Sequence, residues 1–345
     1  MIKVGILNST GYAGSELIRI LQKHPEVTIT AITGRGTVGH KISSVFPHLV
    51  GVDLTIKPEI VESVDVVFSA LPHSASAEKI GPFLKKGVKV IDISADFRLK
   101  DLHTYETWYK TNHPSPEYLG DAVYGLPELH RADIPTAQLV ANPGCYPTSA
   151  ILALAPAISE GIIHPDIIID SKSGTSGAGR GLSLSTHFSE VNENFMAYSL
   201  DGHRHLPEIL QELTNISNSE IDITFLTHLA PMTRGILSTC YARLTDHPFM
   251  SGAKDVSSSI TELYNHFYHN EPFVKICDGS PQTKQTLGSN FCFIHPFIDQ
   301  RTNRLIVLSC LDNLVKGAAG QAVQNMNLML NLPETMALEG LAIYP

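Results

Sequence analysis

The chain lacks the marks of a disulfide scaffold, a zinc protein or a membrane protein. Its five cysteines form no CxxC pair and show no zinc-like spacing to histidine, and they lie at Cys145, Cys240, Cys277, Cys292 and Cys310. No apolar stretch reaches the roughly 18 residues of a membrane span, and the apolar run in MIKVGIL is too short for a signal peptide. We therefore expect a soluble protein of the reducing cytoplasm, with no metal centre.

Charge is also scarce, and the balance is acidic. Charged residues make up 17% of the 345 residues, and 25 Lys and Arg against 34 Asp and Glu give a net charge of -9. A general nucleic-acid binder is usually basic, so that function is disfavoured. Apolar residues, by contrast, reach 43%, which is enough for a large core. At roughly 150 residues per domain, the length predicts about two domains.

The first half of the chain alternates strand and helix patterns. Short apolar runs predict strands at 2–7, 27–33, 65–70, 88–93 and 138–141. Helical patterns predict helices at 15–24, 75–86 and 148–160. This alternation is typical of right-handed βαβ units in a parallel sheet, and residues 95–135 are expected to form long loops and short helices at one end of it.

The second half has a different pattern. Strand-like runs at 167–173, 223–229, 236–244, 291–298 and 305–311 are separated by long segments that do not read as regular helices. This favours a mixed or antiparallel sheet in an α+β domain. A last helix is expected at 317–330, and the small residues at its start (GAAGQA) allow a close approach by another backbone or a ligand.

A glycine-rich turn follows the first predicted strand, in the segment VGILNSTGYAGSEL. Gly11 and Gly14 fit the second and third glycines of a dinucleotide-binding fingerprint, in which a helix N-terminus holds the pyrophosphate. Asn8 replaces the first glycine, and asparagine tolerates a positive φ better than most residues. An ordinary strand–turn–helix is the alternative interpretation of this motif.

The second predicted strand ends in TGRG, where a cofactor with a free ribose 2′-hydroxyl usually meets an acidic residue. Arg35 stands there instead, beside Thr33, and a guanidinium suits a 2′-phosphate. The segment therefore favours NADP over NAD. The alternative is that Arg35 is a solvated loop residue.

Cys145 lies in NPGCYPT, in a turn that leads into the helix expected at 148–160. A thiolate at a helix N-terminus is stabilised by the helix dipole and nearby N–H groups, which also hold an oxyanion on an attacked carbonyl. Cys145 is therefore a candidate nucleophile. The other four cysteines lie in apolar stretches and are better interpreted as small buried residues.

A nucleophilic thiol needs a proton carrier, and GHRHLPE offers His203 and His205. Pro207 suggests that a helix starts there, which leaves the histidines on the preceding loop. If that loop is extended, the two rings point in opposite directions, and only one faces the thiol. We favour His205, because it is nearer Glu208, whose carboxylate could fix the imidazole tautomer. Without Cys145, polar loop histidines would be the better interpretation.

The segment SKSGTSGAGR, residues 171–180, combines hydroxyls and backbone N–H groups with Lys172 and Arg180. Such segments bind phosphate or carboxylate, although a flexible linker is an equally good interpretation. Arg204 and Arg234 are further candidates for anion binding.

Many motifs in order along the chain resemble the N-acetyl-γ-glutamyl-phosphate reductases, of the wider aspartate-semialdehyde dehydrogenase group. They run from GYAGSEL through LPHSAS, DISADFRL, YGLPEL, NPGCYPT, SGTSGAGR, GHRHLPEI, HLAPMTRGI and GSNFCF to DNLVKGAAGQAVQNMN. The main departure from the family's pattern is Asn8 in place of glycine, and TGRG is also unusual.

The resemblance implies an α/β protein of two domains. A Rossmann-type NADP(H)-binding domain would comprise residues 1–145 and about 317–345, because the last helix returns to it. An α+β catalytic and oligomerisation domain with a mixed sheet would comprise residues 146–316. The residues expected to bind the cofactor, from the glycine turn, from TGRG and from the resemblance, are Asn8, Thr10, Gly11, Tyr12, Ala13, Gly14, Thr33, Arg35, Ser69, Pro72, Ser176, Gly177 and Asn313.

The resemblance also implies an activity. A cytoplasmic homodimer or homotetramer would reduce N-acetyl-γ-glutamyl phosphate with NADPH through a thioester on Cys145, in arginine biosynthesis. The GHRH segment matches the family's catalytic histidine region, and Asn313 would lie near the nicotinamide. Two alternatives stay open. One is a reductase of aspartyl phosphate or carrier-bound aminoadipyl phosphate, and the other is a non-catalytic NADP-binding sensor.

Overall fold

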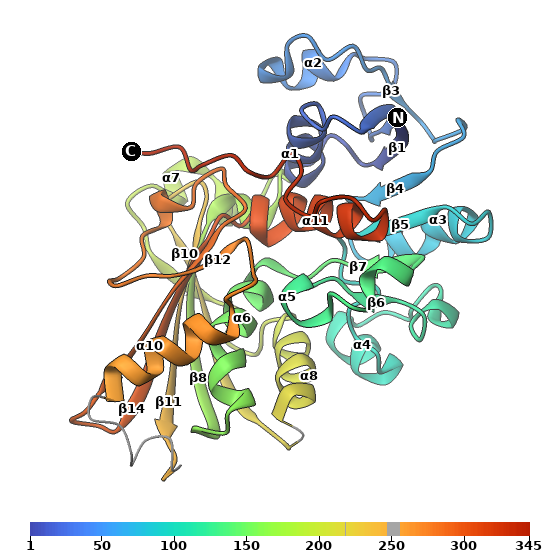
Figure 1. Cartoon of the computed structure of the whole chain (residues 1–345). Coiled ribbons are helices and arrows are strands. Elements are labelled where there is room, and N and C mark those ends of the chain that lie inside the picture. Colours follow the sequence, from blue (N-terminus) through green and yellow to red (C-terminus); the bar gives the residue numbers. More distant parts are fainter. Residues whose placement is uncertain (218, 247–255) are drawn as a thin grey trace. The chain divides into compact units, whose positions relative to one another are not determined.

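The computed structural model describes residues 1–217, 219–246 and 256–345, and its chain forms two compact units (Figure 1). Unit 1 comprises Met1–Gly144 and Ala318–Gly340, and unit 2 comprises Cys145–Gly317 and Leu341–Pro345. The last five residues thus belong to unit 2, whereas the sequence had placed them with the first domain. In unit 2 the Ile343 N–H donates to the Leu287 carbonyl at 2.9 Å.

Unit 1 is built on a parallel sheet with the strand order β3-β2-β1-β4-β5-β7-β6. All of its described strand pairs are parallel, which confirms the predicted Rossmann-type architecture. The strands are β1 (Ile2–Leu7), β2 (Val27–Thr33), β3 (Ile56–Lys57), β4 (Val66–Ser69), β5 (Lys89–Asp92), β6 (Val123–Tyr124) and β7 (Leu139–Ala141). The short strands β3 and β6, at the two edges, were not predicted.

The helices of unit 1 are α1 (Tyr12–Leu21), α2 (Ile42–Val45), α3 (Ala75–Leu84), α4 (Leu102–Tyr109), α5 (Pro127–His130) and α11 (Gly320–Met329). Helix α1 begins three residues earlier than predicted, because the glycine turn itself starts the helix. Helix α11, by contrast, starts later than the predicted residue 317, because a π-helical turn at Val315–Ala319 precedes it.

Helix α11 is buried although it is rich in amides, and hydrogen bonds explain this composition. Gln321 and Asn325 are fully buried, and both donate to the carbonyl of Gly125 at 2.8 Å. A Cβ at Gly125 would stand 2.4 Å from the Asn325 amide nitrogen, so only glycine fits there. The YGLPEL and QAVQNMN motifs therefore meet inside unit 1, where every buried amide needs such a partner.

Unit 2 contains a mixed sheet, which is one of the two predicted arrangements, and its strand order is β12-β13-β14-β11-β8-β10-β9. Strand β8 pairs in parallel with β10 and antiparallel with β11, and β11 and β13 both pair antiparallel with β14. The strands are β8 (Ile163–Gly174), β9 (Met196–Tyr198), β10 (Asp222–Ala230), β11 (Ile236–Leu244), β12 (Val274–Ile276), β13 (Cys292–Asp299) and β14 (Arg304–Leu311).

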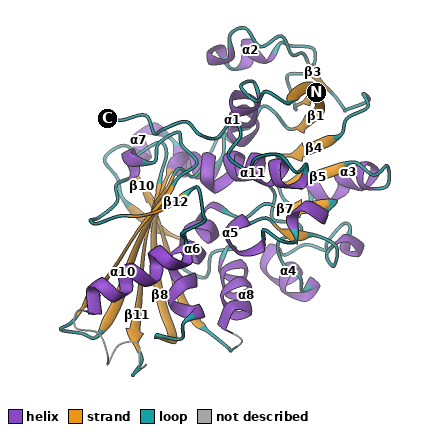
Figure 2. Cartoon of the chain, in the orientation of Figure 1, coloured by secondary structure: helices purple, strands orange, loops and turns teal. Residues whose placement is uncertain are grey.

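Regular helices cover one face of this sheet, which corrects the expectation of long irregular connections (Figure 2). They include two amphipathic helices, α8 and α10, and the apolar α6. The helices of unit 2 are α6 (Cys145–Ser159), α7 (Phe188–Val191), α8 (Leu206–Ser217) and α10 (Val256–Phe267). Helix α6 is apolar on all sides because it packs against the sheet, α8 and α10.

Buried serines attach α6 to the sheet. The Ser149 hydroxyl lies 2.9 Å from that of Ser238 and 3.1 Å from that of Ser309, and the Ser171 hydroxyl lies 2.7 Å from Ser238. These side chains come from α6, β8, β11 and β14, so they fix the helix in position along the sheet.

Residues 171–180 only partly match their predicted flexible character. Residues 171–174 belong to β8, and a short 3-10 helix at Thr175–Ala178 follows. Ser171 and Ser173 face the buried side of the sheet, so their hydroxyls serve packing.

Within the described part of the chain, no helix is long and apolar enough to cross a membrane. Its histidines, cysteines and acidic residues also form no group of three or more that could hold a metal ion.

Candidate active site

The glycine turn of unit 1 is held by the ends of three strands. Asn8 adopts a positive φ of 62°, as its replacement of glycine requires, and its side-chain amide donates to the Ala70 carbonyl at 2.8 Å. The backbone N–H of Asn8 donates to the Thr33 hydroxyl at 3.1 Å, and the N–H of Ser9 donates to the Thr33 carbonyl at 2.7 Å. The asparagine therefore preserves the turn.

The start of α1 fits the pyrophosphate of a dinucleotide. Its N-cap, Gly11, has no side chain to accept from the first N–H groups, and no acidic residue lies in the first turn that contains Tyr12 and Ala13. The positive end of the helix dipole is therefore not neutralised by a residue of that turn. Gly14 lets α1 approach the turn, because a Cβ there would stand 2.5 Å from the Asn8 carbonyl oxygen.

Replacing Gly14 with alanine is expected to weaken NADPH binding by about 10-fold or more, because the new Cβ meets backbone that cannot move independently. Gly81→Ala is the matched control in the same unit, since a Cβ there makes only ordinary contact with Tyr118. NADPH fluorescence titration and thermal unfolding of both variants provide the measurement. Equal NADPH affinity in the two variants would contradict this interpretation of the turn.

The other cofactor candidates of unit 1 differ in exposure. Arg35 is exposed. The side chain of Thr10 packs against Gly34, where an added Cβ would lie only 2.7 Å from the Thr10 methyl carbon. Ser69 is fully buried, and its hydroxyl lies 2.7 Å from the Ser76 hydroxyl. Pro72 is exposed. Their cofactor roles stay predictions.

Cys145 is the first residue of α6 and is partly exposed. Three residues earlier, Asn142 is fixed on both sides, because its N–H donates to the Asp92 carbonyl at 2.8 Å and its carbonyl accepts from Arg98 at 2.7 Å. The helix begins at Cys145 itself, so the turn that precedes it is shorter than predicted. A thiol at this place is suited to nucleophilic attack.

The remaining cysteines are poor nucleophiles. Cys240, Cys292 and Cys310 are buried in strands, and burial raises the pKa of the Cys240 and Cys310 thiols to about 12. Cys277 is partly exposed, but desolvation and Asp278 raise its pKa as well.

Both histidines of the GHRH loop lie against the ring of Tyr146, the residue after Cys145. The ring centroids of His203 and His205 are 5.3 and 5.9 Å from that of Tyr146, and 4.8 Å from each other. The expectation that they point in opposite directions is therefore wrong. The loop is not extended but turns, because the Leu206 N–H donates to the His203 carbonyl at 2.9 Å.

The two histidines differ in what they can do. The Nδ1 atom of His203 accepts from the His205 N–H at 3.1 Å, so this nitrogen carries no proton. Burial, and secondly the charge of Arg204, lower the pKa of His203 to about 4. Imidazole at position 203 is therefore neutral at pH 7 and positions the backbone of His205. Glu208 is buried in the first turn of α8, and its role as partner of His205 stays a prediction.

His203 is expected to stay neutral from pH 8 down to about pH 5, because its pKa is lowered from 6.5 to about 4. Histidine-selective NMR on the full chain follows the ring carbons through this range. A His203 ring that becomes protonated near pH 6.5 would contradict the assignment, and the signals of His203→Asn identify the residue.

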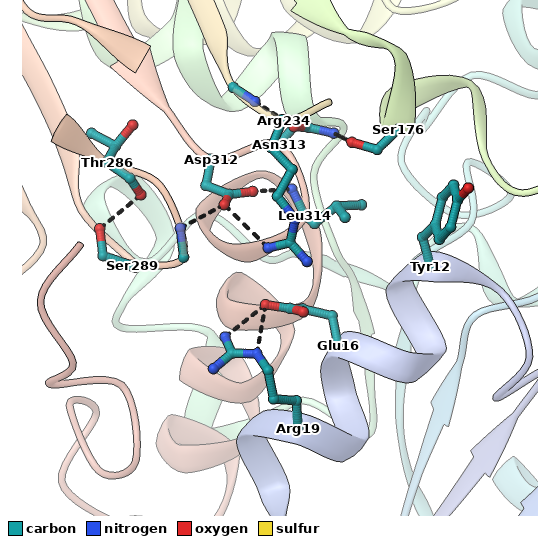
Figure 3. A network of polar contacts seen from close by, with 12 residues as sticks. Tyr12, Glu16, Arg19, Ser176, Arg234, Thr286, Ser289, Asp312, Asn313 and Leu314 are labelled. Carbon is teal, nitrogen blue, oxygen red and sulfur yellow. Dashed lines mark hydrogen bonds and ion pairs between the residues drawn. The ribbon is translucent and has the colours of Figure 1, made fainter. Parts of the chain in front are cut away.

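A polar network at the end of β14 joins the cofactor candidates of unit 2 (Figure 3). The side chain of Asn313 accepts from the Gly235 N–H at 2.8 Å and donates to the Ser176 hydroxyl at 2.9 Å. A Cβ at Gly177 would stand 3.0 Å from the Ser173 hydroxyl, so that turn is also tight. Asn313, Ser176 and Gly177 thus lie together, and their cofactor roles stay predictions.

The four predicted anion-binding side chains have different surroundings. Lys172 forms an ion pair with Asp170 at 2.7 Å and, by strand alternation from Ser171, lies on the sheet face opposite α6. Arg180 and Arg204 are exposed. Arg234 pairs with Asp312 at 3.3 Å. Their substrate roles stay predictions.

Sequence reasoning missed three residues near Cys145. The hydroxyls of Tyr146 and Tyr198 form a hydrogen bond of 2.9 Å. Burial raises the pKa of both phenols, and the charge of Cys145 contributes to the shift. A Cβ at Gly317 would stand 2.7 Å from the Cys145 Cβ. The signal for Gly317 was the run of small residues GAAGQA, whereas nothing local marked Tyr198.

Comparison with known proteins agrees with this geometry. Residues 3–137 match the semialdehyde dehydrogenase NAD-binding domain, and residues 145–313 match the semialdehyde dehydrogenase dimerisation domain. A relative from Dehalococcoides mccartyi strain CBDB1, named N-acetyl-gamma-glutamyl-phosphate reductase, is 54% identical over 99% of both chains. The chain belongs to this family of semialdehyde dehydrogenases. It is an oxidoreductase, and NADP(H) is its cofactor.

Further relatives extend the similarity. A Pelotomaculum thermopropionicum protein of the same name is 52% identical over 100% of this chain and 99% of its own. Among solved structures, aspartate semialdehyde dehydrogenase II from Vibrio cholerae has a TM-score of 0.71 at 17% identity, covering 96% of this chain and 98% of its own. The Candida albicans aspartate semialdehyde dehydrogenase with NADP has a TM-score of 0.70 at 16% identity, covering 96% and 99%. These structures share the fold.

Proposed function

We propose that the chain reduces N-acetyl-γ-glutamyl phosphate to N-acetylglutamate 5-semialdehyde with NADPH and releases phosphate, as a step of arginine biosynthesis. The names of relatives that are 50–54% identical over at least 99% of this chain support the substrate. The observation that carries the chemistry is the placement of Cys145, partly exposed at the first residue of α6 and adjacent to Tyr146, whose ring contacts both histidines.

In the first step the Cys145 thiolate attacks the carbonyl carbon of the acyl phosphate. Backbone N–H groups at the start of α6 stabilise the oxyanion that forms. The bond between carbon and the phosphate oxygen then breaks, phosphate leaves, and a thioester remains on Cys145. Thioesters accept hydride more readily than carboxylates, which is the advantage of covalent catalysis here.

NADPH held by the glycine turn would supply a hydride, and the thioester carbon on Cys145 would accept it to give a thiohemiacetal. Protonated His205 then donates its proton to the developing alkoxide or directly to the departing sulfur. In the first case the hydroxyl proton returns to His205 and passes to the sulfur as the carbon–sulfur bond breaks. Cleavage of the carbon–sulfur bond releases the semialdehyde and regenerates the thiol. In the reverse direction His205 acts as a base. His203 keeps His205 in place through its Nδ1, and Glu208 sets the tautomer.

The acyl phosphate and the carboxylate of the substrate need positive partners, for which we retain Arg180, Arg204 and Arg234. Lys172 and Arg234 each form an ion pair with a carboxylate, that of Asp170 at 2.7 Å and that of Asp312 at 3.3 Å. Lys172 is retained as a fourth candidate. In the cofactor domain, Arg35 is the proposed partner of the 2′-phosphate.

We propose a homodimer or homotetramer in the cytoplasm. The matching dimerisation domain supports assembly. The sheet face opposite α6 is suited to it, because Ile168 there is 42% exposed and alternates with the buried Ile167 and Ile169.

The experiment that tests the substrate measures phosphate-dependent oxidation of N-acetylglutamate semialdehyde and of aspartate semialdehyde, each with NADP⁺ and NAD⁺. We expect kcat/KM to favour the N-acetylated substrate by about 10²-fold or more, and NADP⁺ over NAD⁺. A preference for aspartate semialdehyde would identify the aspartyl phosphate reductase instead. Binding of NADP⁺ without turnover of either aldehyde would favour the sensor.

A further inference from the structure

Asp312, the residue after β14, is a buried carboxylate with donors from three segments (Figure 3). Its side chain accepts from the Leu314 N–H at 2.8 Å and from the Gly288 N–H at 2.7 Å. It also pairs with the guanidinium of Arg234 at 3.3 Å. A buried carboxylate is costly unless it is paired and hydrogen-bonded, and here it is both.

The backbone of Asp312 organises the turn that follows. Its carbonyl accepts from the Val315 N–H at 3.2 Å and from the Gly317 N–H at 3.0 Å. The turn ends at Gly317, whose absent Cβ would stand 2.7 Å from the Cβ of Cys145 and 3.2 Å from its Cα. Gly317, at the end of this turn, therefore packs directly against the proposed nucleophile.

Asn313 ties the same turn to two more loops, through the Gly235 N–H and the Ser176 hydroxyl. A shift of Asp312 would be transmitted to Cys145 along this turn, because Gly317 leaves no gap that absorbs it. Helix α6 cannot follow such a shift freely, since Ser149 is bonded to the sheet.

We propose that Asp312 is a positioning residue for Cys145, acting through the turn 312–317. This inference rests on the proposed role of Cys145 as the nucleophile. It assigns the carboxylate a role in catalysis without contact with substrate. Tight geometry matters for such a step, because a displacement of about 1 Å in a reacting group costs up to about 10²-fold in rate.

The test uses Asp312→Asn in the full chain. Asparagine keeps one acceptor oxygen and places an NH2 group against the remaining donors. We expect kcat to fall about 10-fold or more, with KM for NADP⁺ within about twofold. KM for the acyl substrate is not used as a readout, because the variant also removes the charged partner of Arg234. Labelling of Cys145 by iodoacetamide, followed by mass spectrometry of the cysteine peptides, should slow about fivefold at its high-pH plateau. Cys277, which is partly exposed, is the internal reference.

The matched control is Asp299→Asn. Asp299 also forms an ion pair with an arginine, Arg301, at 3.1 Å. In the sheet it lies opposite Arg304, the first residue of β14, whereas Asp312 follows the last residue of that strand. If Asp312 serves stability alone, Asp312→Asn lowers the unfolding temperature but leaves kcat per folded molecule and the labelling of Cys145 unchanged. That result would overturn the proposal.

If Asp312→Asn does not fold, Gly317→Ala tests the same contact from its other end. Its Cβ must displace Cys145, so kcat should fall about 10²-fold, whereas Gly181→Ala, where a Cβ meets nothing within 4 Å, should not change it. Wild-type kcat in Gly317→Ala would also overturn the proposal. An active Cys145→Ser would instead refute the proposed function itself, so the two failures are distinguishable.

Discussion

Cys145→Ser is expected to lose turnover by about 10³-fold or more, while NADPH binds as before. A serine hydroxyl at the start of α6 is almost entirely protonated at neutral pH, so it cannot attack the acyl phosphate as a thiolate does. The glycine turn and α1 belong to the other unit and are unchanged by the substitution. Initial rates with N-acetylglutamate semialdehyde, NADP⁺ and phosphate, together with NADPH fluorescence titration, provide the measurement.

Cys277→Ser is the control for this experiment, because Cys277 is also partly exposed but lies after β12 and has a raised pKa. It should keep wild-type turnover. The covalent scheme would be wrong if Cys145→Ser retained most of its activity.

His205→Asn is expected to lower kcat by about 10²-fold or more, because the proton carrier of the thiohemiacetal step is removed. The matched variant is His203→Asn. Its amide oxygen takes the place of Nδ1 as acceptor for the His205 N–H, so the loop keeps its conformation. We therefore expect His203→Asn to lose less than about 10-fold.

The pH profile distinguishes the two histidines further. The limb of the kcat/KM profile that belongs to the acid–base group should disappear in His205→Asn and persist in His203→Asn. This follows because the pKa of His203, lowered to about 4 by burial, leaves this ring neutral over the whole range near pH 7. A larger loss in His203→Asn than in His205→Asn would reverse the assignment.

Local sequence patterns predicted the long strands well. The predicted bounds of β1, β2 and β11 agree with the structure, because each is an apolar run between turn residues or charges. Of the two- and three-residue strands, β7 was predicted, whereas β3, β6, β9 and β12 were not. Such strands exist only through a partner strand, and β9, for example, is defined by its pairing with β10.

The connections of unit 2 were predicted less well for a different reason. Pro207 predicted the start of α8, but the extent of α8 and the whole of α10 were not predicted. Both helices are amphipathic, with polar residues on one side. Composition gave two interpretations at 171–174, because serine and glycine suggested flexibility while the strand predicted at 167–173 covered most of the same residues. There Ser171 is a buried strand residue bonded to Ser238, 67 positions away in the sequence.

The candidate site divides in the same way. Cys145 and the GHRH histidines were found because their chemistry is written in short motifs. Asp312 and Tyr198 were not, because their significance comes from partners such as Gly288 or Tyr146 that only the fold brings close. The extended conformation considered for the GHRH loop is not the one observed, for the same reason. A local turn and the ring of Tyr146 place both histidines on one side.

The central claim is the covalent thioester on Cys145, and it is tested most directly by trapping that species. The enzyme is mixed with N-acetylglutamate semialdehyde and NADP⁺ without phosphate, quenched in acid and digested for mass spectrometry. The account predicts a burst of NADPH equal to the enzyme sites and an acyl group on the peptide containing Cys145. Formation of NADPH with Cys145 unmodified would contradict it.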